Sequence, residues 1–229
     1  MTKTFAMAVS LALIVTLAVS PVWAVGDKVR SDNAAGPAGS TGGGEAVTNR
    51  GETVGPNDQS LGVLTDEEIG HIKYIREEEK LARDVYLTIY EQFIDNCDID
   101  PILVQVFDNI SESEQRHMDA VKRLIDKYEL EDPVKDNPVG VFTDKKLQEL
   151  YDGLVARVVN DSLCDNYCEA LQVGIEIETL DIADLESALL LPDIKEDVAR
   201  VFNNLLSGSY NHFNAFTSQA LAIECSAIP

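Results

Sequence analysis

The chain has 229 residues and a formal net charge of -22, with 40 acidic side chains against 18 Lys and Arg. Binding to nucleic acid or to an anionic membrane surface requires clustered Lys and Arg, so this charge argues against both classes of partner. The same acidity is compatible with attracting cations, but it also raises solubility. Charge alone is therefore a weak indication of a metal-binding protein.

Residues 1–24 have the features of a secretory signal peptide. Lys3 precedes an apolar run from Phe5 to Val19, and a small-residue cleavage pattern ends at Ala24. The run is shorter than the roughly 20 residues of a membrane-spanning helix, so an uncleaved anchor is the weaker alternative. We expect cleavage near Ala24, no stable membrane insertion, and a mature protein that is secreted, periplasmic or held in the cell envelope.

Residues 25–63 are rich in Gly, Ser, Pro and Asn. Such a segment buries too little apolar area to offset its chain entropy, so we expect a disordered tether. Residues 64–225 are then a single domain.

Apolar residues in this domain recur at spacings of three and four, which predicts an all-α fold. The expected helices cover about 65–93, 101–128, 143–159, 161–190 with a break or bend near Asp181, and 193–223. Four of them are long, and the second and third long helices are separated by a longer connection. We therefore predict an antiparallel four-helix bundle with a long crossover containing an extra helix.

The four cysteines, an even number in an exported chain, predict two disulfides. The predicted crossover would bring all four to one pole of the bundle. We expect Cys97 to pair with Cys164 or Cys168, and Cys225 to take the other. Zinc binding is the competing interpretation, but the sequence has no second close Cys or His pair to complete the spacing of Cys164 and Cys168.

Ionisable residues occupy positions on two apolar stripes. Glu79 lies between Ile75 and Ala82 on the first helix, and Glu114 and His117 lie three apart on the second. A buried carboxylate is costly unless it is paired or binds a cation, and several in one core repel one another. These three residues are therefore candidate metal ligands, although Glu-x-x-His pairs also occur on helix surfaces.

Other polar residues have simpler interpretations. We expect Glu77 and Glu78 to be solvated and His71 to lie at the surface. Tyr86 and Tyr90 could bond a metal ligand or carry an electron, but packing in an aromatic core is the favoured role.

The segment Glu79-Lys80-Leu81-Ala82-Arg83-Asp84-Val85-Tyr86 resembles the first-helix Glu-x-x-Ala-Arg-x-x-Tyr motif of rubrerythrins, and Glu114-Gln115-Arg116-His117 resembles their second-helix Glu-x-x-His. Three longer runs are similar to the ferritin-like family called domain of unknown function 2202. They are residues 76–86, 175–185 and 208–212. That resemblance covers essentially the whole region from Leu64 to Ile223 and implies a ferritin-like bundle.

The resemblance also implies further metal ligands. Glu178 and Asp181 are similar to a third-helix carboxylate pair, and His212 corresponds to the fourth-helix histidine. A complete di-iron bundle has a Glu three residues before that histidine. Ser209 stands there instead, and Asp181 is the candidate replacement.

Iron is the expected cofactor, as one or two ions, with manganese or zinc as alternatives. The expected function is that of an exported ferritin-like protein with a di-iron carboxylate site and ferroxidase-like or peroxide-reducing activity. Its partners would be metal ions, oxygen or peroxide, and an external electron donor, because the sequence has no rubredoxin-like Cys-x-x-Cys pair. The alternative is a non-catalytic metal-binding or structural bundle, in which Ser209 marks lost catalysis. A homodimer is left open.

Overall fold

The computed structural model describes residues 63–225 of the chain. The predicted signal peptide and nearly all of the predicted tether lie outside these residues. Within them, the secondary structure is entirely helical. The elements are α1 (Asp66–Asn96), α2 (Pro101–Lys127), α3 (Lys145–Val158), the short 3-10 helix η1 (Leu163–Asp165), α4 (Tyr167–Leu189) and α5 (Glu196–Ala222).

Short polar side chains define where several helices begin. At α1, Thr65 Oγ1 accepts a hydrogen bond from the backbone N–H of Glu68, and the Glu68 carboxylate accepts one from that of Thr65. This reciprocal pair is a capping box. Asp100 and Asp144 cap α2 and α3 through side-chain oxygens that accept from backbone N–H groups of the first turn, and Pro101 lies in the first turn of α2.

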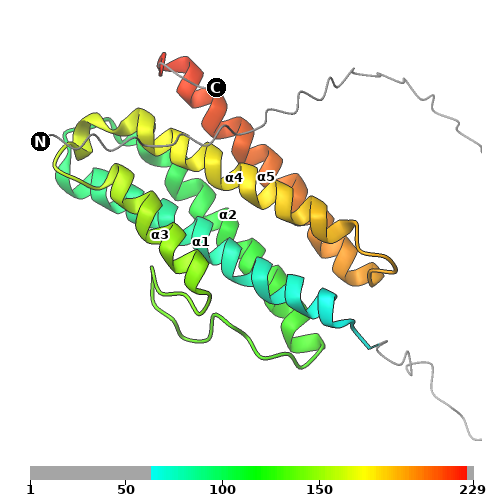
Figure 1. Cartoon of the computed structure of the whole chain (residues 1–229). Helices are drawn as coiled ribbons and strands as arrows, with labels where there is room; N and C mark the ends of the chain where they lie inside the picture. The colour runs from blue at the N-terminus through cyan, green and yellow to red at the C-terminus, as the bar shows by residue number, and fades with distance from the viewer. Residues whose placement is uncertain (1–62, 226–229) are drawn as a thin grey trace, which may run out of the picture. The chain divides into compact units, whose positions relative to one another are not determined.

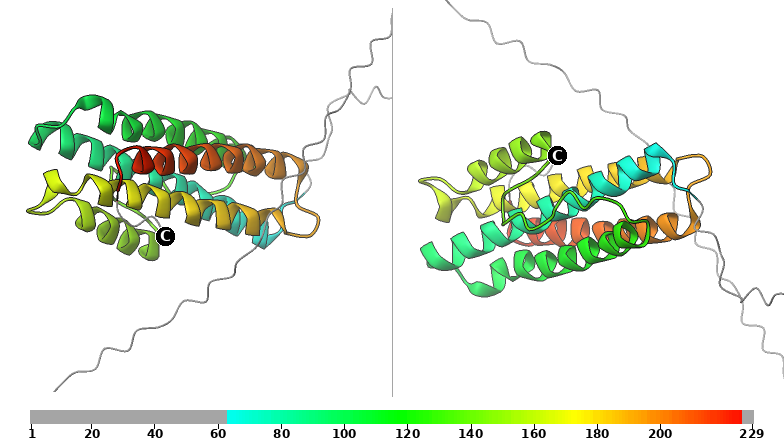
Figure 2. Two further views of the ribbon diagram at one scale, coloured as in Figure 1. Left: turned by 90° about the horizontal axis from the view of Figure 1, so that it is seen from above. Right: turned by 90° about the horizontal axis from the view of Figure 1, so that it is seen from below.

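The long helices form two antiparallel pairs. Residues 97–100 join α1 to α2, and residues 190–195 join α4 to α5. The pairs pack together through α1 against α4 and α2 against α5, while the shorter α3 lies against α1 and α4 (Figures 1 and 2). The described residues are thus a helical bundle, and the connection from α2 to α4 contains an extra helix, as predicted. The predicted break or bend near Asp181 is not a break, because Asp181 lies buried inside the continuous helix α4.

Buried apolar side chains form two clusters along the bundle. One contains an aromatic group, Tyr86, Phe93, Phe107, Tyr167 and Phe216. The other contains mainly aliphatic residues, among them Ile72, Ile75, Val121, Leu185 and Leu205. Buried acidic side chains and a histidine are found at intervening positions along the same helices, so the core includes a polar layer.

All four cysteines are paired at one end of the bundle, which we call the disulfide pole. Cys97 bonds to Cys164, and Cys168 bonds to Cys225. This is one of the two predicted pairings. The bonds join the end of α1 to η1 and the start of α4 to the end of α5. Cys97 follows Glu79 by 18 residues, about 27 Å along an α-helix, so the disulfides are remote from the polar layer.

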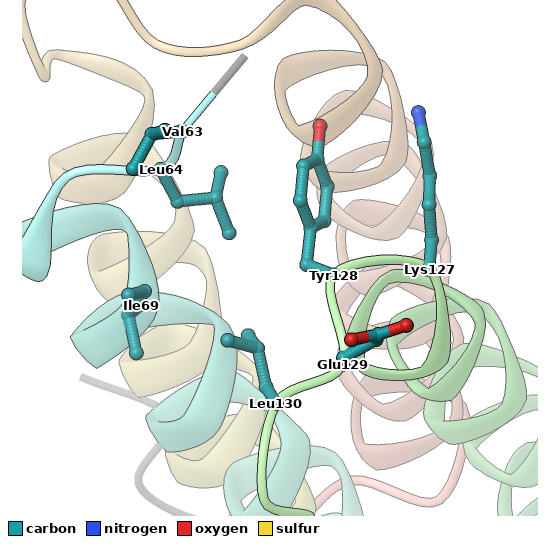
Figure 3. Close-up of a pocket in the computed structure, with 7 residues that line it drawn as sticks. All are labelled: Val63, Leu64, Ile69, Lys127, Tyr128, Glu129 and Leu130. Carbon is teal, nitrogen blue, oxygen red and sulfur yellow. The ribbon is translucent and has the colours of Figure 1, made fainter. Parts of the chain in front are cut away.

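At the opposite pole, a small network of hydrogen bonds joins the helix ends, and the surface has a shallow hollow. Val63, Leu64 and Ile69 face Tyr128 and Leu130 across this hollow (Figure 3). Its lining is mainly apolar, so it offers no obvious chemistry.

Two hydrogen bonds join the helix ends at that pole. The hydroxyl of Tyr128 donates to the carboxylate of Asp197 in α5, and the backbone N–H of Lys195 donates to Glu68. These bonds connect the start of α1, the end of α2 and the start of α5. Within the described part of the chain, no helix has the length and apolar character needed to cross a membrane.

The loop that follows α2, residues 128–144, runs along α1, and we call it the crossover loop. The Glu77 carboxylate accepts hydrogen bonds from the backbone N–H groups of Thr143 and Asp144. Lys80 Nζ donates to the carbonyl oxygen of Pro138 over 2.8 Å. The prediction that Glu77 is solvated is therefore wrong, because the crossover loop covers this side of α1 and bonds to it.

Candidate metal centre

Three residues from two helices bring potential metal-ligand atoms together. Glu114 and His117 of α2 and His212 of α5 each offer one such atom, and these atoms all lie within 4.8 Å of one another. His117 Nδ1 is 2.8 Å from Glu114 Oε2, and His212 Nδ1 is 2.7 Å from Glu114 Oε1. The Glu114 carboxylate therefore contacts both imidazole rings through different oxygens, and the two rings stack with their centroids 5.4 Å apart. We call these residues the triad.

Two further predicted ligands contact the histidines of the triad. Glu79 Oε2 of α1 is 3.2 Å from His117 Nδ1, and Glu178 Oε2 of α4 is 3.6 Å from His212 Nδ1. Both carboxylates are about 1% exposed. All four long helices thus contribute to one buried group of acids and imidazoles.

The sixth predicted ligand, Asp181, is hydrogen-bonded to Ser209, the residue that departs from the di-iron pattern. Ser209 Oγ lies in hydrogen-bond contact with Asp181 Oδ2 and with the carbonyl oxygen of Leu205. Asp181 is one turn beyond Glu178 on α4, and Ser209 is one turn before His212 on α5. The serine therefore holds an acid from the neighbouring helix instead of supplying its own.

Small neighbours allow both imidazoles to fit between α2 and α5. His212 Nε2 is 2.9 Å from Ser113 Oγ, which leaves Nδ1 facing Glu114. At Gly208, a methyl group would collide with Nε2 and Cε1 of His117. The side chains of His117 and His212 are 13% and 9% exposed. The triad therefore lies close to the molecular surface, where α2 and α5 meet.

Several ligand atoms are buried without a hydrogen-bond partner among residues 63–225. They include Glu79 Oε1, Glu114 Oε1, Asp181 Oδ1 and His212 Nδ1. The 2.7 Å contact between Glu114 and His212 joins two of these atoms without the alignment of a hydrogen bond. An unpartnered buried polar group costs about 1–3 kcal/mol, and more if it is charged. A shared cation would satisfy these atoms together, so the residues fit a bound metal.

Within the triad, the charges favour an ionised acid and protonated imidazoles. Burial alone would raise the pKa of Glu114, but its close contacts with His117 and His212 lower it to about 2. Burial alone would lower the pKa of His117, but its bonds to Glu114 and Glu79 raise it to about 11. The pKa of His212 is raised to about 9 against the effect of burial, through Glu114 and Glu178.

The surrounding acids have raised pKa values, in contrast to Glu114. Burial and then the charge of Glu114 raise the pKa of Glu178 to about 8. Burial raises the pKa of Asp181 to about 7, although the Ser209 hydroxyl opposes this change. The pKa of Glu79 is also raised, by burial and by the charge of Asp181. Protons therefore limit the negative charge in this core, and a metal cation could replace them.

Two contributions from α1 differ from the interpretations that the sequence favoured. Glu78 was expected to be solvated, but it is 4% exposed, so that prediction is wrong. Tyr86 was assigned mainly to packing, and it does pack among aromatic rings, but its hydroxyl also donates to Glu178 Oε1 over 2.7 Å. The burial of Glu78 could have been inferred from Leu81 and Val85. These apolar residues lie off the predicted stripe and indicate that α1 is covered on more than one side.

Residues 68–224 match the family described as "Uncharacterized protein domain (DUF2202)". The chain is 46% identical to the uncharacterized protein MJ0754 of Methanocaldococcus jannaschii over 153 residues, which cover 67% of this chain and 75% of that protein. The crystal structure of hypothetical protein MJ0754 from Methanococcus jannaschii is similar, with a TM-score of 0.64 at 43% identity over 73% of this chain and 87% of that one. The chain therefore belongs to the family of domain of unknown function 2202.

Proposed function

We propose that this protein is a ferritin-like bundle that binds a redox-active transition metal, with iron as the foremost candidate. The observation that carries the proposal is the triad, whose buried ligand atoms converge from α2 and α5 and in part lack hydrogen-bond partners in the described residues. A mixed set of carboxylates and imidazoles suits iron, and also manganese and zinc. The proposed ligands are Glu79, Glu114, His117, Glu178, Asp181 and His212.

This ligand set supports one or two ions. It offers four carboxylates and two imidazoles, the number found in di-iron bundles, although one acid comes from α4 and not from α5. Glu114 is central because its two oxygens face different histidines. Glu114 would therefore hold metal together with both histidines.

We further propose ferroxidase-like or peroxide-reducing activity. Bound iron would supply redox chemistry between its ferrous and ferric states. The protein would exclude bulk water through the aromatic cluster and orient Glu178 through the Tyr86 hydroxyl. Reduction of peroxide to water consumes two protons and two electrons. An external donor would supply the electrons and solvent the protons, because the ligand carboxylates hold a metal in their ionised form.

The second candidate function is a metal-binding or structural module without catalysis. Ser209 favours it, because the hydroxyl of this residue bonds to Asp181 and so holds one oxygen of a proposed ligand. In either case we propose an exported protein. The two disulfides are typical of an oxidising compartment, and the signal peptide prediction agrees with them.

The test compares metal content and redox activity in histidine variants of the untagged protein. We expect His117→Ala and His212→Ala to lose bound iron after anaerobic reconstitution. His71→Ala is the matched control, since this histidine of α1 lies outside the centre, and it should retain iron. Peroxide-dependent Fe(II) oxidation by the parent protein would establish the activity. Iron binding without it would favour the second candidate, and failure of the parent to bind iron, manganese or zinc would overturn the proposal.

A further inference from the structure

Glu78 is a buried carboxylate that the proposed ligand set does not use. It is 4% exposed, and its Oε2 has no hydrogen-bond partner within the described part of the chain. Both of its neighbours have defined polar contacts, Glu77 with backbone N–H groups of the crossover loop and Glu79 with His117. A buried acid with an unpartnered oxygen is costly, so its position requires an explanation.

The helix geometry directs Glu78 toward α4. Successive side chains project about 100° apart around an α-helix. Glu77 faces the crossover loop and Glu79 faces α2, so Glu78 projects between these directions, where α4 packs against α1. On α4, Glu78 interacts with the carboxyl groups of Asp181 and Asp184.

Two more unpartnered oxygens lie at the same interface. Asp181 Oδ1 of α4 is buried without a partner among residues 63–225, while Oδ2 of the same residue bonds to Ser209. Glu79 Oε1 is likewise unpartnered, although Oε2 contacts His117. Asp181 and Glu79 thus each have one carboxylate oxygen in a polar contact and one without a partner. The free oxygens are spaced more widely than the ligand atoms of the triad, so a shared cation would draw them together by side-chain rotation.

We propose that Glu78, Glu79 and Asp181 form a second cation site beside the triad. Glu78 of α1 then supplies the carboxylate that α5 lacks at Ser209. This inference rests on the proposed function and extends it, because the centre becomes asymmetric. The triad offers two imidazoles and a carboxylate, whereas the second site offers only carboxylate oxygens, which favour a harder ion such as Mn²⁺.

The experiment is a Mn²⁺ titration of the full exported chain, followed by the electron paramagnetic resonance signal of the free ion. We expect two Mn²⁺ per chain for the parent. In Glu78→Gln the second ion should be lost or bound at least tenfold more weakly. Glu77→Gln is the matched control, since it removes a neighbouring buried carboxylate that faces the crossover loop, and it should retain both ions. Asp181→Asn should reproduce the loss, which keeps the test decisive if Glu78→Gln folds poorly.

The outcomes separate this inference from the proposed function. If the Glu78→Gln and Asp181→Asn proteins bind Mn²⁺ with the stoichiometry and affinity of the parent, while His117→Ala loses metal, the second site is refuted and the proposed function stands. The same holds if the parent binds a single ion that depends on His117. If the parent binds no ion at all, both proposals fail. Increased stability of Glu78→Gln with unchanged metal binding would show that Glu78 is a protonated structural residue.

Discussion

The hydroxyl of Tyr86 donates a hydrogen bond to Oε1 of Glu178 over 2.7 Å and so joins α1 to α4 beside the triad. The other oxygen of Glu178 faces His212 Nδ1. Tyr86 itself is fully buried, with its ring centroid 5.1 Å from that of Phe216 and 6.3 Å from that of Phe107. A rigid aromatic residue therefore determines which oxygen of Glu178 is available to a metal.

Tyr86→Phe removes this bond and keeps the ring. We expect the free energy of unfolding to fall by roughly 1–3 kcal/mol, because the buried Glu178 oxygen loses its donor. We also expect Mn²⁺ affinity to fall about 10-fold or more, as for other residues that orient ligands. Urea denaturation and metal titration measure these effects, with Tyr90→Phe on the same helix as control. Parent-like values for both quantities would exclude an orienting role for Tyr86.

Gly208 offers a steric test of the triad. A methyl group at this position would collide with the His117 ring, so Gly208→Ala should displace the imidazole and weaken metal binding. Gly153→Ala is the control, since its new methyl group on α3 would meet open space. That change should raise the free energy of unfolding by about 0.5–1 kcal/mol, as expected for Gly to Ala in a helix. Equal metal binding by the two variants would mean that the His117 position does not matter.

The stability of the protein stripped of metal should depend on pH. The pKa values of Glu178 and Asp181 are raised to about 8 and 7, so the folded state retains protons that the unfolded chain releases above about pH 4. Their stabilising effect is complete below that pH and is lost as the pH rises through 7 and 8. His212 acts in the same direction, because its pKa is raised to about 9.

We therefore expect the free energy of unfolding in a chelator to fall by on the order of 2 kcal/mol or more between pH 5.5 and 8.5. Urea denaturation at several pH values measures the slope. Saturating Mn²⁺ should flatten or reverse it, because the cation replaces the protons. Asp181→Asn should also reduce the slope in the chelator. A stability that rises over this range would contradict the assigned pKa directions.

Local periodicity predicted the helices and two members of the triad, Glu114 and His117, whereas His212 was predicted from the family resemblance. Glu114 and His117 share a face at a spacing of three, and this spacing is independent of the partner helices. Burial of Glu77 and Glu78 could not be predicted in the same way. It depends on α4 and the crossover loop, which pack against two further sides of α1 and are distant in sequence. Similarly, a side chain such as Asp181 can end a helix or face a core, and its contact with Ser209 decides between these roles.

The disulfides should affect stability without affecting metal binding. Each closes a loop of about 60 residues, with sequence separations of 67 and 57. Removing either pair, as Cys97→Ser with Cys164→Ser or Cys168→Ser with Cys225→Ser, should lower the free energy of unfolding by about 2–4 kcal/mol. Metal stoichiometry should not change, because the disulfide pole is about 27 Å from Glu79 along α1. Loss of metal from a folded variant of this kind would indicate that the pole and the centre are coupled.

The motif around Glu79 combines two separable roles, which a final pair of variants should distinguish. Lys80 and Asp84 form a fully buried ion pair, and Lys80 Nζ also lies 4.5 Å from the ring centroid of Phe142. The backbone N–H of Gly140 donates to Asp84 over 2.9 Å. These groups face the crossover loop, whereas Glu79 faces the triad.

Asp84→Ala leaves the Lys80 ammonium buried without its partner, so the free energy of unfolding should fall by about 3–5 kcal/mol. Its metal stoichiometry should match the parent at temperatures where the variant is folded. Glu79→Gln should give the reverse result, with weaker metal binding and a stability in chelator equal to or above that of the parent, because it removes a buried acid with an unpartnered oxygen. Denaturation and Mn²⁺ titration of both variants test this separation. If Asp84→Ala loses metal while still folded, the crossover loop must take part in building the centre.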